Sequence, residues 1–393
     1  MPLTESHSVE LGKRIDYNAS ILFGSMKMKN NLLRMPHGTE SLYLEETYRH
    51  KKILRHMEDL TESWGYLPVQ TPVFDYYDNY RPLLESRLEE QTYKLIDRDG
   101  DMMMLRSDIT LFLARQMGLA LTEEDMPMRV YYADSILRYQ DHEDISNHES
   151  FQTGCELIGC PGIEGDLEII FLLAEVLETY KLPQSRIHVG STALFQAIAT
   201  PFPAEDSRRL NKKLHTREKD AIRQILQNVY KKEDAEELTR LLLFIGTGEE
   251  FCARSREWRT LLDGALESSL DYLLQINKGW KDLGAFADKF RIDLSETGDL
   301  PYYSGIVFNA YTDGCGTALA SGGRYDGLLE NFGYSGSKPA SSVGFSLFLR
   351  KLEKLSGLDM GKPASLHSEN ENTLTAAERF IKAAALRKQT GVQ

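Results

Sequence analysis

The sequence predicts an α+β fold, with a mainly antiparallel sheet flanked by helices. Short strand-like runs joined by turn signals favour hairpin pairing, and hairpin-paired strands are antiparallel. Segments of helical period stand before and between these runs, which is typical of helices packed on one face of such a sheet. Residues 194–280 have a helical pattern with no convincing strand, so we expect a helical insertion there.

The elements follow in order along the chain. Residues 40–64 show helical spacing, and Gly65 ends that helix. Asp97 to Asp101 form a hairpin turn signal between two strands. Helices are expected at 108–121, 165–180 and 343–355, and strands at 67–74, 93–96, 102–105, 129–136, 306–311 and 316–320.

These elements divide the chain into three parts. Residues 1–34 have no clear period and are expected to form an N-terminal arm. Residues 35–355 are expected to form one domain that contains the insertion at 194–280. Residues 356–393 are expected to be a linker and C-terminal tail, with a short helix at 373–388.

Composition excludes several classes of protein. With 41% hydrophobic and 27% charged residues, the balance is that of a globular protein. A net charge of -13 disfavours nucleic-acid partners, and no apolar run approaches the roughly 20 residues of a membrane span. The four cysteines have neither zinc spacing nor disulfide density, and no signal sequence is visible. We therefore expect a cytoplasmic protein without a metal, a cofactor, a nucleic-acid partner or a membrane partner.

Three polar clusters interrupt the strand-like segments. The first contains Asp108 and Thr110, for which a helix cap at Ser107 or Asp108 is the simpler explanation. The others are Arg138 with Gln152 and Glu156, and Tyr302 and Tyr303 with Gly322, Gly323, Arg324 and Tyr325.

The second cluster implies a polar ligand or an internal ion pair. Gln152 and Glu156 are four apart, so they face the same side of an extended strand among apolar neighbours. A buried carboxylate needs a partner, which leaves open a ligand, a cation or a core pair between Glu156 and Arg138. In the third cluster, a simple Gly-Gly surface turn is the alternative to close backbone approach to a ligand.

Together the clusters have the chemistry of a site for a zwitterion with a polar ring. Asp108 and Gln152 offer oxygens to an ammonium group, and Arg138 offers a fork to a carboxylate. Glu156 and a tyrosine hydroxyl are suited to fixing the two nitrogens of an imidazole.

The order of these clusters resembles the catalytic domain of class II aminoacyl-tRNA synthetases, and histidyl-tRNA synthetase in particular. The resemblance covers residues 36–355 and includes LIDRDGDMMMLRSDIT, QTGCELIG, YYSGIVF and SGGRYDGLL, the last two being similar to the histidine-specific signatures. Residues 65–73 resemble the first class II motif, which builds a dimer interface. The resemblance implies the following ligand contacts: Asp108, Thr110 and Gln152 to the amino group, Arg138 to the carboxylate, Glu156 and Tyr303 to the imidazole, with Tyr302 beside them and Gly322 and Gly323 forming the floor next to Arg324 and Tyr325.

Departures from the synthetase motifs concern ATP and tRNA. Aligned on Tyr302, the activating arginine of R-G-L-D-Y-Y is replaced by Gly298, and Gln140 replaces the carboxylate of the second motif. The third motif G-L-E-R is replaced by Phe348-Leu349-Arg350-Lys351, in which a shifted alignment would keep the charge of Arg350. The 38 residues after Leu355 are too few for an anticodon-binding domain.

This pattern resembles the regulatory subunits of ATP phosphoribosyltransferase, paralogues of the synthetase. The resemblance implies no catalytic residue, histidine binding for feedback inhibition, and activation of a short catalytic subunit in the first step of histidine biosynthesis. It also implies a homodimer within a hetero-oligomer. The alternatives are a divergent synthetase domain that activates histidine with ATP and a histidine-sensing module for another partner.

Overall fold

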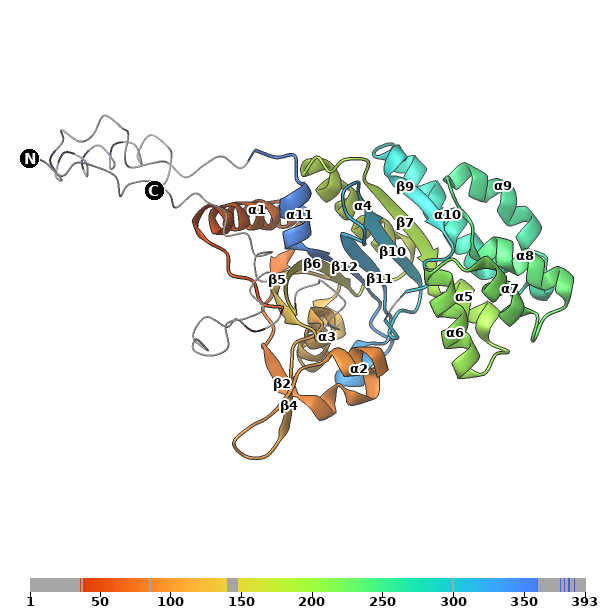
Figure 1. Ribbon diagram of the computed structural model, residues 1–393, viewed down its shortest axis with the longest axis horizontal. Helices are drawn as coiled ribbons and strands as arrows, with labels where there is room; N and C mark the ends of the chain where they lie inside the picture. The colour runs from red at the N-terminus through yellow and green to blue at the C-terminus, as the bar shows by residue number, and fades with distance from the viewer. Residues whose placement is uncertain are drawn as a thin grey trace, which may run out of the picture.

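The computed structural model describes residues 36, 38–84, 86–139, 148–298 and 300–359, with 375, 378, 381 and 385 (Figure 1). The expected arm at 1–34 and Gln140 lie outside these ranges. Most of the expected linker and most of the expected terminal helix at 373–388 lie outside them as well. Among the described residues, no helix is of the length and apolarity that crossing a membrane requires.

A nine-stranded sheet forms the centre of the fold, in the order β1-β5-β6-β12-β11-β10-β7-β9-β8. Its pairs are antiparallel except β1–β5 and β7–β9, which are parallel. The strands are β1 (Leu67–Pro68), β5 (Met128–Leu137), β6 (Glu149–Ile158), β7 (Arg186–Ser191), β8 (Ile245–Gly246), β9 (Phe290–Asp293), β10 (Ile306–Tyr311), β11 (Ala320–Arg324) and β12 (Ser342–Phe348). A second sheet, β2-β4-β3, consists of β2 (Phe74–Tyr76), β3 (Lys94–Ile96) and β4 (Met102–Leu105).

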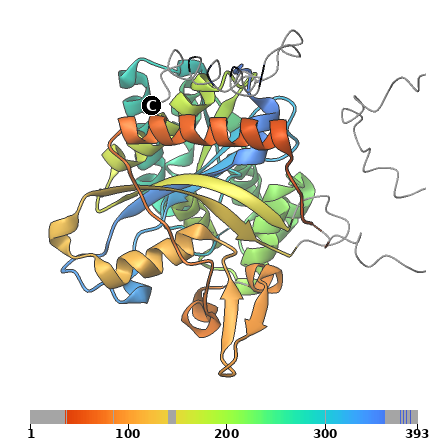
Figure 2. The same cartoon turned by 90° about the vertical axis from the view of Figure 1, so that its left-hand side faces the viewer.

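Helices cover the sheet on both sides. The helices are α1 (Leu44–Ser63), α2 (Ser86–Gln91), α3 (Ile109–Ala120), α4 (Ile163–Thr179), α5 (Thr192–Ala199), α6 (Ala204–His215), α7 (Lys219–Leu226), α8 (Lys232–Leu242), α9 (Gly248–Trp258), α10 (Glu267–Leu283) and α11 (Leu349–Leu355), with short 3-10 turns such as η4 (Arg81–Leu83) and η8 (Leu329–Phe332). Figure 2 shows α1 lying across the front of the sheet.

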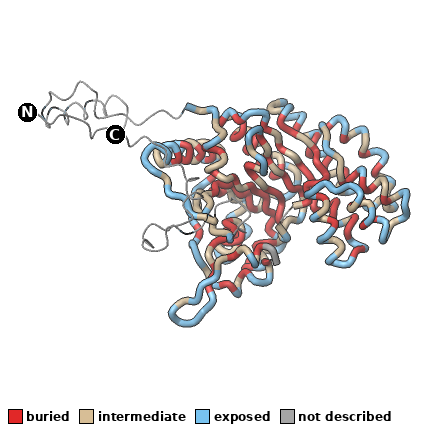
Figure 3. Tube along the Cα trace, in the orientation of Figure 1, coloured by how far each residue is buried: buried red, intermediate tan, exposed pale blue. Residues whose placement is uncertain are grey.

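Two apolar clusters separate the two sides of the sheet. The larger joins α1, α4 and α11 to side chains such as Leu157 and Phe345. The smaller joins α3 and η8 to side chains such as Tyr132 and Tyr325. The red, buried segments in Figure 3 follow the sheet and the helix faces turned towards it. The sheet is therefore buried on both faces, and polar side chains at its centre are surrounded by apolar ones.

The helical insertion consists of α5 to α10, residues 192–283, at the right of Figure 1. Its apolar side chains belong to the larger cluster, so it is packed onto the sheet and not tethered beside it. It also contains the two-residue strand β8, which pairs with β9 and which the helical pattern did not predict.

Three expectations about elements are wrong. Residues 343–355 are not one helix, because β12 precedes α11; a central strand that buries both faces loses the alternation that identifies strands. The strand expected at 316–320 begins instead at Ala320 and contains the Gly322-Gly323 pair, so the pair is not a surface turn. Residues 67–74 do not form one strand but contribute to β1 and β2 in different sheets.

Candidate functional site

Glu156 lies at the centre of the sheet, on β6, with 1% of its surface exposed. Its cross-strand neighbour on β12 is Gly344, which in turn pairs with Gly323 on β11. A Cβ on Gly344 would lie 1.6 Å from Glu156 Oε2. Gly344 therefore leaves the space over the sheet that the carboxylate occupies.

Three hydroxyl groups point at this carboxylate. Tyr325 donates to Oε2 at 2.7 Å and Thr110 to Oε1 at 2.9 Å, while Tyr132 is 3.5 Å from Oε1. Burial raises the pKa of Glu156 to about 8, because desolvation outweighs these hydrogen bonds and the nearby Asp108 carboxylate adds to it. Glu156 is thus a proton-exchanging group near neutral pH.

Asp108 forms a second polar group beside the first. Its Oδ2 lies 3.3 Å from Arg138 Nη2 and accepts from the Tyr302 hydroxyl at 3.3 Å. Its Oδ1 accepts from the backbone N–H of Leu111 and so caps α3. The two explanations of Asp108, helix cap and site residue, are therefore compatible. Arg138 pairs with Asp108, so the alternative of a core pair with Glu156 is wrong.

Gln152 and Tyr303 complete the same side of the sheet. Gln152 is four residues from Glu156 on β6, is buried, and projects to the same face. A Cβ on Gly323 would lie 2.8 Å from the Tyr303 ring, so that ring lies directly over Gly323. Burial raises the pKa of the Tyr302 and Tyr325 hydroxyls, which keeps both protonated as hydrogen-bond donors.

Gly322 and Arg324 lie on the other face of the sheet. Gly322 pairs with Phe345 and a Cβ there would meet Phe308, away from Glu156. The Arg324 guanidinium is 2.6 Å from Asp166 on α4, and both side chains are almost wholly buried. Arg324 therefore fixes the backbone next to Tyr325, and its guanidinium is not near the Glu156 carboxylate.

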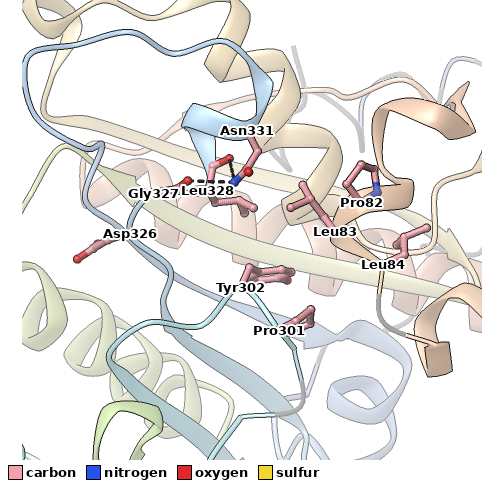
Figure 4. A pocket seen from close by; sticks show the side chains of 9 residues that line it. All are labelled: Pro82, Leu83, Leu84, Pro301, Tyr302, Asp326, Gly327, Leu328 and Asn331. Atoms are coloured by element: carbon pink, nitrogen blue, oxygen red, sulfur yellow. Dashed lines mark hydrogen bonds between the residues drawn. The ribbon is translucent and has the colours of Figure 1, made fainter. Parts of the chain in front are cut away.

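A cavity of about 340 Å³ opens beside Tyr302 (Figure 4). Its walls come from three segments that are distant in sequence: the turn at Pro82 to Leu84, the Pro301-Tyr302 pair, and Asp326 to Leu328 with Asn331. Asn331 Nδ2 donates to the carbonyls of Gly327 and Leu328, which fixes the third wall. Because Tyr302 also contacts Asp108, the cavity adjoins the polar cluster.

The positions that hold ATP in the synthetase motifs are occupied by internal contacts. Arg350 pairs with Glu353 at 2.7 Å and with Glu40 at 2.8 Å. Lys351 donates to Thr317 and to the carbonyl of Ala318. Both cations therefore have partners on the α1 and α11 side of the sheet or at its margin.

A second polar cluster lies where the sheet meets the insertion. Within the described residues, His188, Asp293 and Glu296 are the group whose ligand-type atoms lie within 4.8 Å of one another. Burial opposes ionisation of Asp293, but hydrogen bonds from His188 and Ser295 and the nearby Arg217 hold its pKa below the ordinary value. Tyr311 and Asn309 donate to Glu296. Because protein donors already satisfy both carboxylates, we assign no metal to this cluster.

Sequence reasoning missed Tyr132, Gly154 and Gly344. Tyr132 pairs with Gly154, and a Cβ on Gly154 would lie 2.4 Å from the Tyr132 hydroxyl, so glycine lets the ring reach Glu156. The available signal was glycine in QTGCELIG and SSVGFSL, at positions where strand interiors rarely carry it.

A mainly antiparallel sheet with a buried carboxylate, a capping aspartate and two tyrosine-bearing loops indicates a class II aminoacyl-tRNA synthetase-like domain. The histidyl-tRNA synthetase family profile matches residues 38–352. The chain therefore belongs to the histidyl-tRNA synthetase family.

Several of its relatives are named regulatory subunits. It is 31% identical over 330 residues, 83% of this chain and 82% of the other, to the ATP phosphoribosyltransferase regulatory subunit of Moorella thermoacetica. With the same-named protein of Bacillus subtilis it shares 31% identity over 82% of this chain and 81% of the other.

Solved structures agree on the fold. A regulatory subunit/histidyl-tRNA synthetase from Bacillus halodurans has a TM-score of 0.76 at 25% identity, covering 92% of this chain and 91% of that one. Histidyl-tRNA synthetase from Nostoc, at 18% identity, has a TM-score of 0.72 over 92% of this chain and 85% of that one.

Proposed function

We propose that this chain is the non-catalytic regulatory subunit of an ATP phosphoribosyltransferase, which binds L-histidine and activates a short catalytic subunit. The observation that carries the proposal is a split within one fold. The hydroxyl-lined Glu156 cluster is complete, whereas the ATP-holding positions are Gly298 and the internally paired Arg350 and Lys351. The regulatory name of the relatives agrees with that split.

Histidine is placed by matching its three polar groups to the cluster. Its imidazole lies between Glu156 and Tyr303, which suits a carboxyl group whose pKa is near 8. Its ammonium group replaces Arg138 as the partner of Asp108, with Thr110 and Gln152 nearby. Arg138 is then released to bind the histidine carboxylate.

The same pocket can hold histidine without activating it. Activation requires ATP bound with its α-phosphate beside the histidine carboxylate, and stabilising that charge takes preorganised cations. Arg350 and Lys351 would have to give up two internal contacts each to reach a nucleotide. This disfavours the alternative of an ATP-dependent histidine-activating enzyme.

The three-stranded sheet is the surface we assign to a second copy of the chain. Exposed apolar side chains are concentrated there and on β1: Leu67, Val73, Phe74, Tyr76, Leu95, Ile96 and Met102. Exposed apolar clusters of this kind mark association surfaces. Homodimerisation through β2, β3 and β4 accounts for their exposure, and the catalytic subunit then joins the dimer.

Calorimetric titration of the purified chain with L-histidine, run beside a histidine-dependent ATP–pyrophosphate exchange assay, tests the proposal. We expect binding without exchange. Histamine, which lacks the carboxylate, is the matched ligand control and is expected to bind more weakly through loss of the Arg138 contact. Exchange activity would support the alternative of a histidine-activating enzyme. Absence of histidine binding would refute the sensor role.

The partner is tested by adding a short-form ATP phosphoribosyltransferase catalytic subunit. We expect co-elution, a rise in its turnover and inhibition by histidine. Histidine binding without any effect on that subunit would favour a sensing module for another partner.

A further inference from the structure

We propose that the helical insertion positions both tyrosine-bearing segments of the histidine pocket, through Arg217 and Tyr272, and so sets the affinity for the ligand. The inference rests on the proposed function and adds a role for the insertion, whose residues lie outside the pocket. Two separate series of hydrogen bonds and ion pairs, called contact paths below, support it.

The first contact path reaches the segment that ends in Tyr302 and Tyr303. Arg217, in the turn after α6, is 2.5 Å from Asp293, which is fully buried at the end of β9. From α6 itself, Asn211 accepts a hydrogen bond from Thr297. Residues 294–298 run directly from Asp293 towards the two tyrosines, so the insertion holds the base of that segment on two points.

The first turn of α5 holds the same segment from its other side. Thr192 Oγ1 donates to the carbonyl of Thr297 at 2.9 Å, and its N–H bonds the carbonyl of Gly305 at 2.9 Å. A Cβ on Gly190 would lie 2.0 Å from the carbonyl oxygen of Glu296, so the segment lies flat against β7. The segment is therefore gripped on both flanks, before and after the tyrosines.

The second contact path reaches Tyr325. Tyr272 on α10 is hydrogen-bonded to Asp166 on α4, and Asp166 is 2.6 Å from Arg324. Arg324 also bonds the carbonyl of Gly162 at 2.8 Å and Asp326 at 3.1 Å, which fixes the backbone around Tyr325. Tyr325 is the 2.7 Å donor to Glu156. Through buried polar partners, α10 is thus linked to the group that faces the ligand.

The two contact paths differ in burial, and the more deeply buried Tyr272–Asp166 contact is expected to be the stronger. The Arg217 side chain is 41% exposed, so water screens its pair with Asp293 in part. Asp166 is fully buried, so the Tyr272 hydroxyl serves a carboxylate that has no solvent alternative. We expect the loss of either contact to loosen its segment, with an effect on histidine affinity that exceeds its effect on stability.

The test compares Arg217→Ala and Tyr272→Phe with wild type in the full chain. Tyr272→Phe is expected to weaken histidine binding about fivefold or more, the factor that one lost polar contact typically produces. Arg217→Ala is expected to weaken it by a smaller factor, because water already screens the Arg217–Asp293 pair in part. Arg217→Lys keeps a cation and is expected to recover part of the affinity. Arg240→Ala is the matched control, because Arg240 pairs with Glu237 on the surface of the insertion and belongs to neither contact path.

Two readouts separate positioning from a structural role. Calorimetry measures Kd, and thermal unfolding measures Tm; a purely structural role lowers Tm and leaves Kd unchanged, which would overturn the inference. Amide hydrogen exchange of residues 300–305 and 323–326 without ligand is expected to accelerate in the respective variant. That readout needs no histidine, so unchanged exchange refutes the inference even if wild type fails to bind histidine, a failure that would count against the proposed function alone.

Discussion

Replacing Glu156 by glutamine is expected to stabilise the ligand-free protein at alkaline pH while weakening its affinity for histidine. The folded-state pKa of Glu156 is about 8, against an ordinary 4.5. Between these values the folded protein keeps a proton that the unfolded chain has released. The free energy of unfolding therefore falls as pH rises through this window, and it stops falling above pH 8.

The size of the effect follows from the same two values. The gap between 4.5 and about 8, at roughly 1.4 kcal/mol per pH unit, corresponds to about 5 kcal/mol of stability lost by pH 9. Glutamine cannot ionise, so the variant lacks this contribution. Its amide can still accept from Tyr325, and the Thr110 hydroxyl can rotate to accept from the new NH₂ group.

Urea unfolding of wild type and Glu156→Gln at pH 6, 7, 8 and 9 measures the difference. We expect the two stabilities to be closest at pH 6, and the variant to gain about 3 kcal/mol on wild type between pH 6 and pH 9. All other titrating groups are shared, so their contributions cancel in the comparison. Parallel pH profiles would show that Glu156 ionises normally and would refute the reasoning.

Histidine titration of the same two proteins completes the test. Under the proposed contact between Glu156 and the imidazole, loss of the carboxylate is expected to weaken binding by roughly 1–3 kcal/mol. A variant that is more stable and binds less well is the pattern of a site that sacrifices stability for ligand recognition. Unchanged affinity would remove Glu156 from the imidazole contact.

Two further substitutions test other parts of the structure. Gly344→Ala is expected to abolish detectable histidine binding and to lower the Tm, because its Cβ would lie 1.6 Å from Glu156 Oε2 and 2.5 Å from the Cys155 carbonyl. Wild-type affinity in this variant would refute the register of β12 against β6. Gly316→Ala is the control, because nothing lies near the Cβ position of Gly316. Phe74→Asp is expected to convert the proposed homodimer to monomers in light-scattering measurements, because Phe74 is 56% exposed within the apolar three-stranded sheet. Leu119→Asp, at a residue 67% exposed on α3, is expected to leave the dimer intact, and a dimeric Phe74→Asp protein would place the association surface elsewhere.

The sequence by itself determined the α+β class, because helical period and hairpin signals are local. Helices α1, α3 and α4 and the β3–β4 hairpin lie close to the predicted ranges. The residue types of the pocket were also readable: Glu156 among apolar neighbours required a partner, and the structure supplies Thr110 and Tyr325. Assignment of those residues to histidine remains a prediction.

Only the tertiary structure decided which residues meet across the sheet. The identity of a cross-strand neighbour depends on register, and a shift of one residue moves every side chain to the other face. Register placed Gly344 beside Glu156 and Gly323 beside Gly344, and turned Arg324 away from the pocket towards Asp166. The tertiary structure also brought Arg217 of the insertion against Asp293, 76 positions away, and Tyr272 against Asp166, 106 positions away, contacts that no local pattern contains. Central strands such as β12 were hidden from the sequence for a related reason, since burial on both faces removes the alternation by which a strand is recognised.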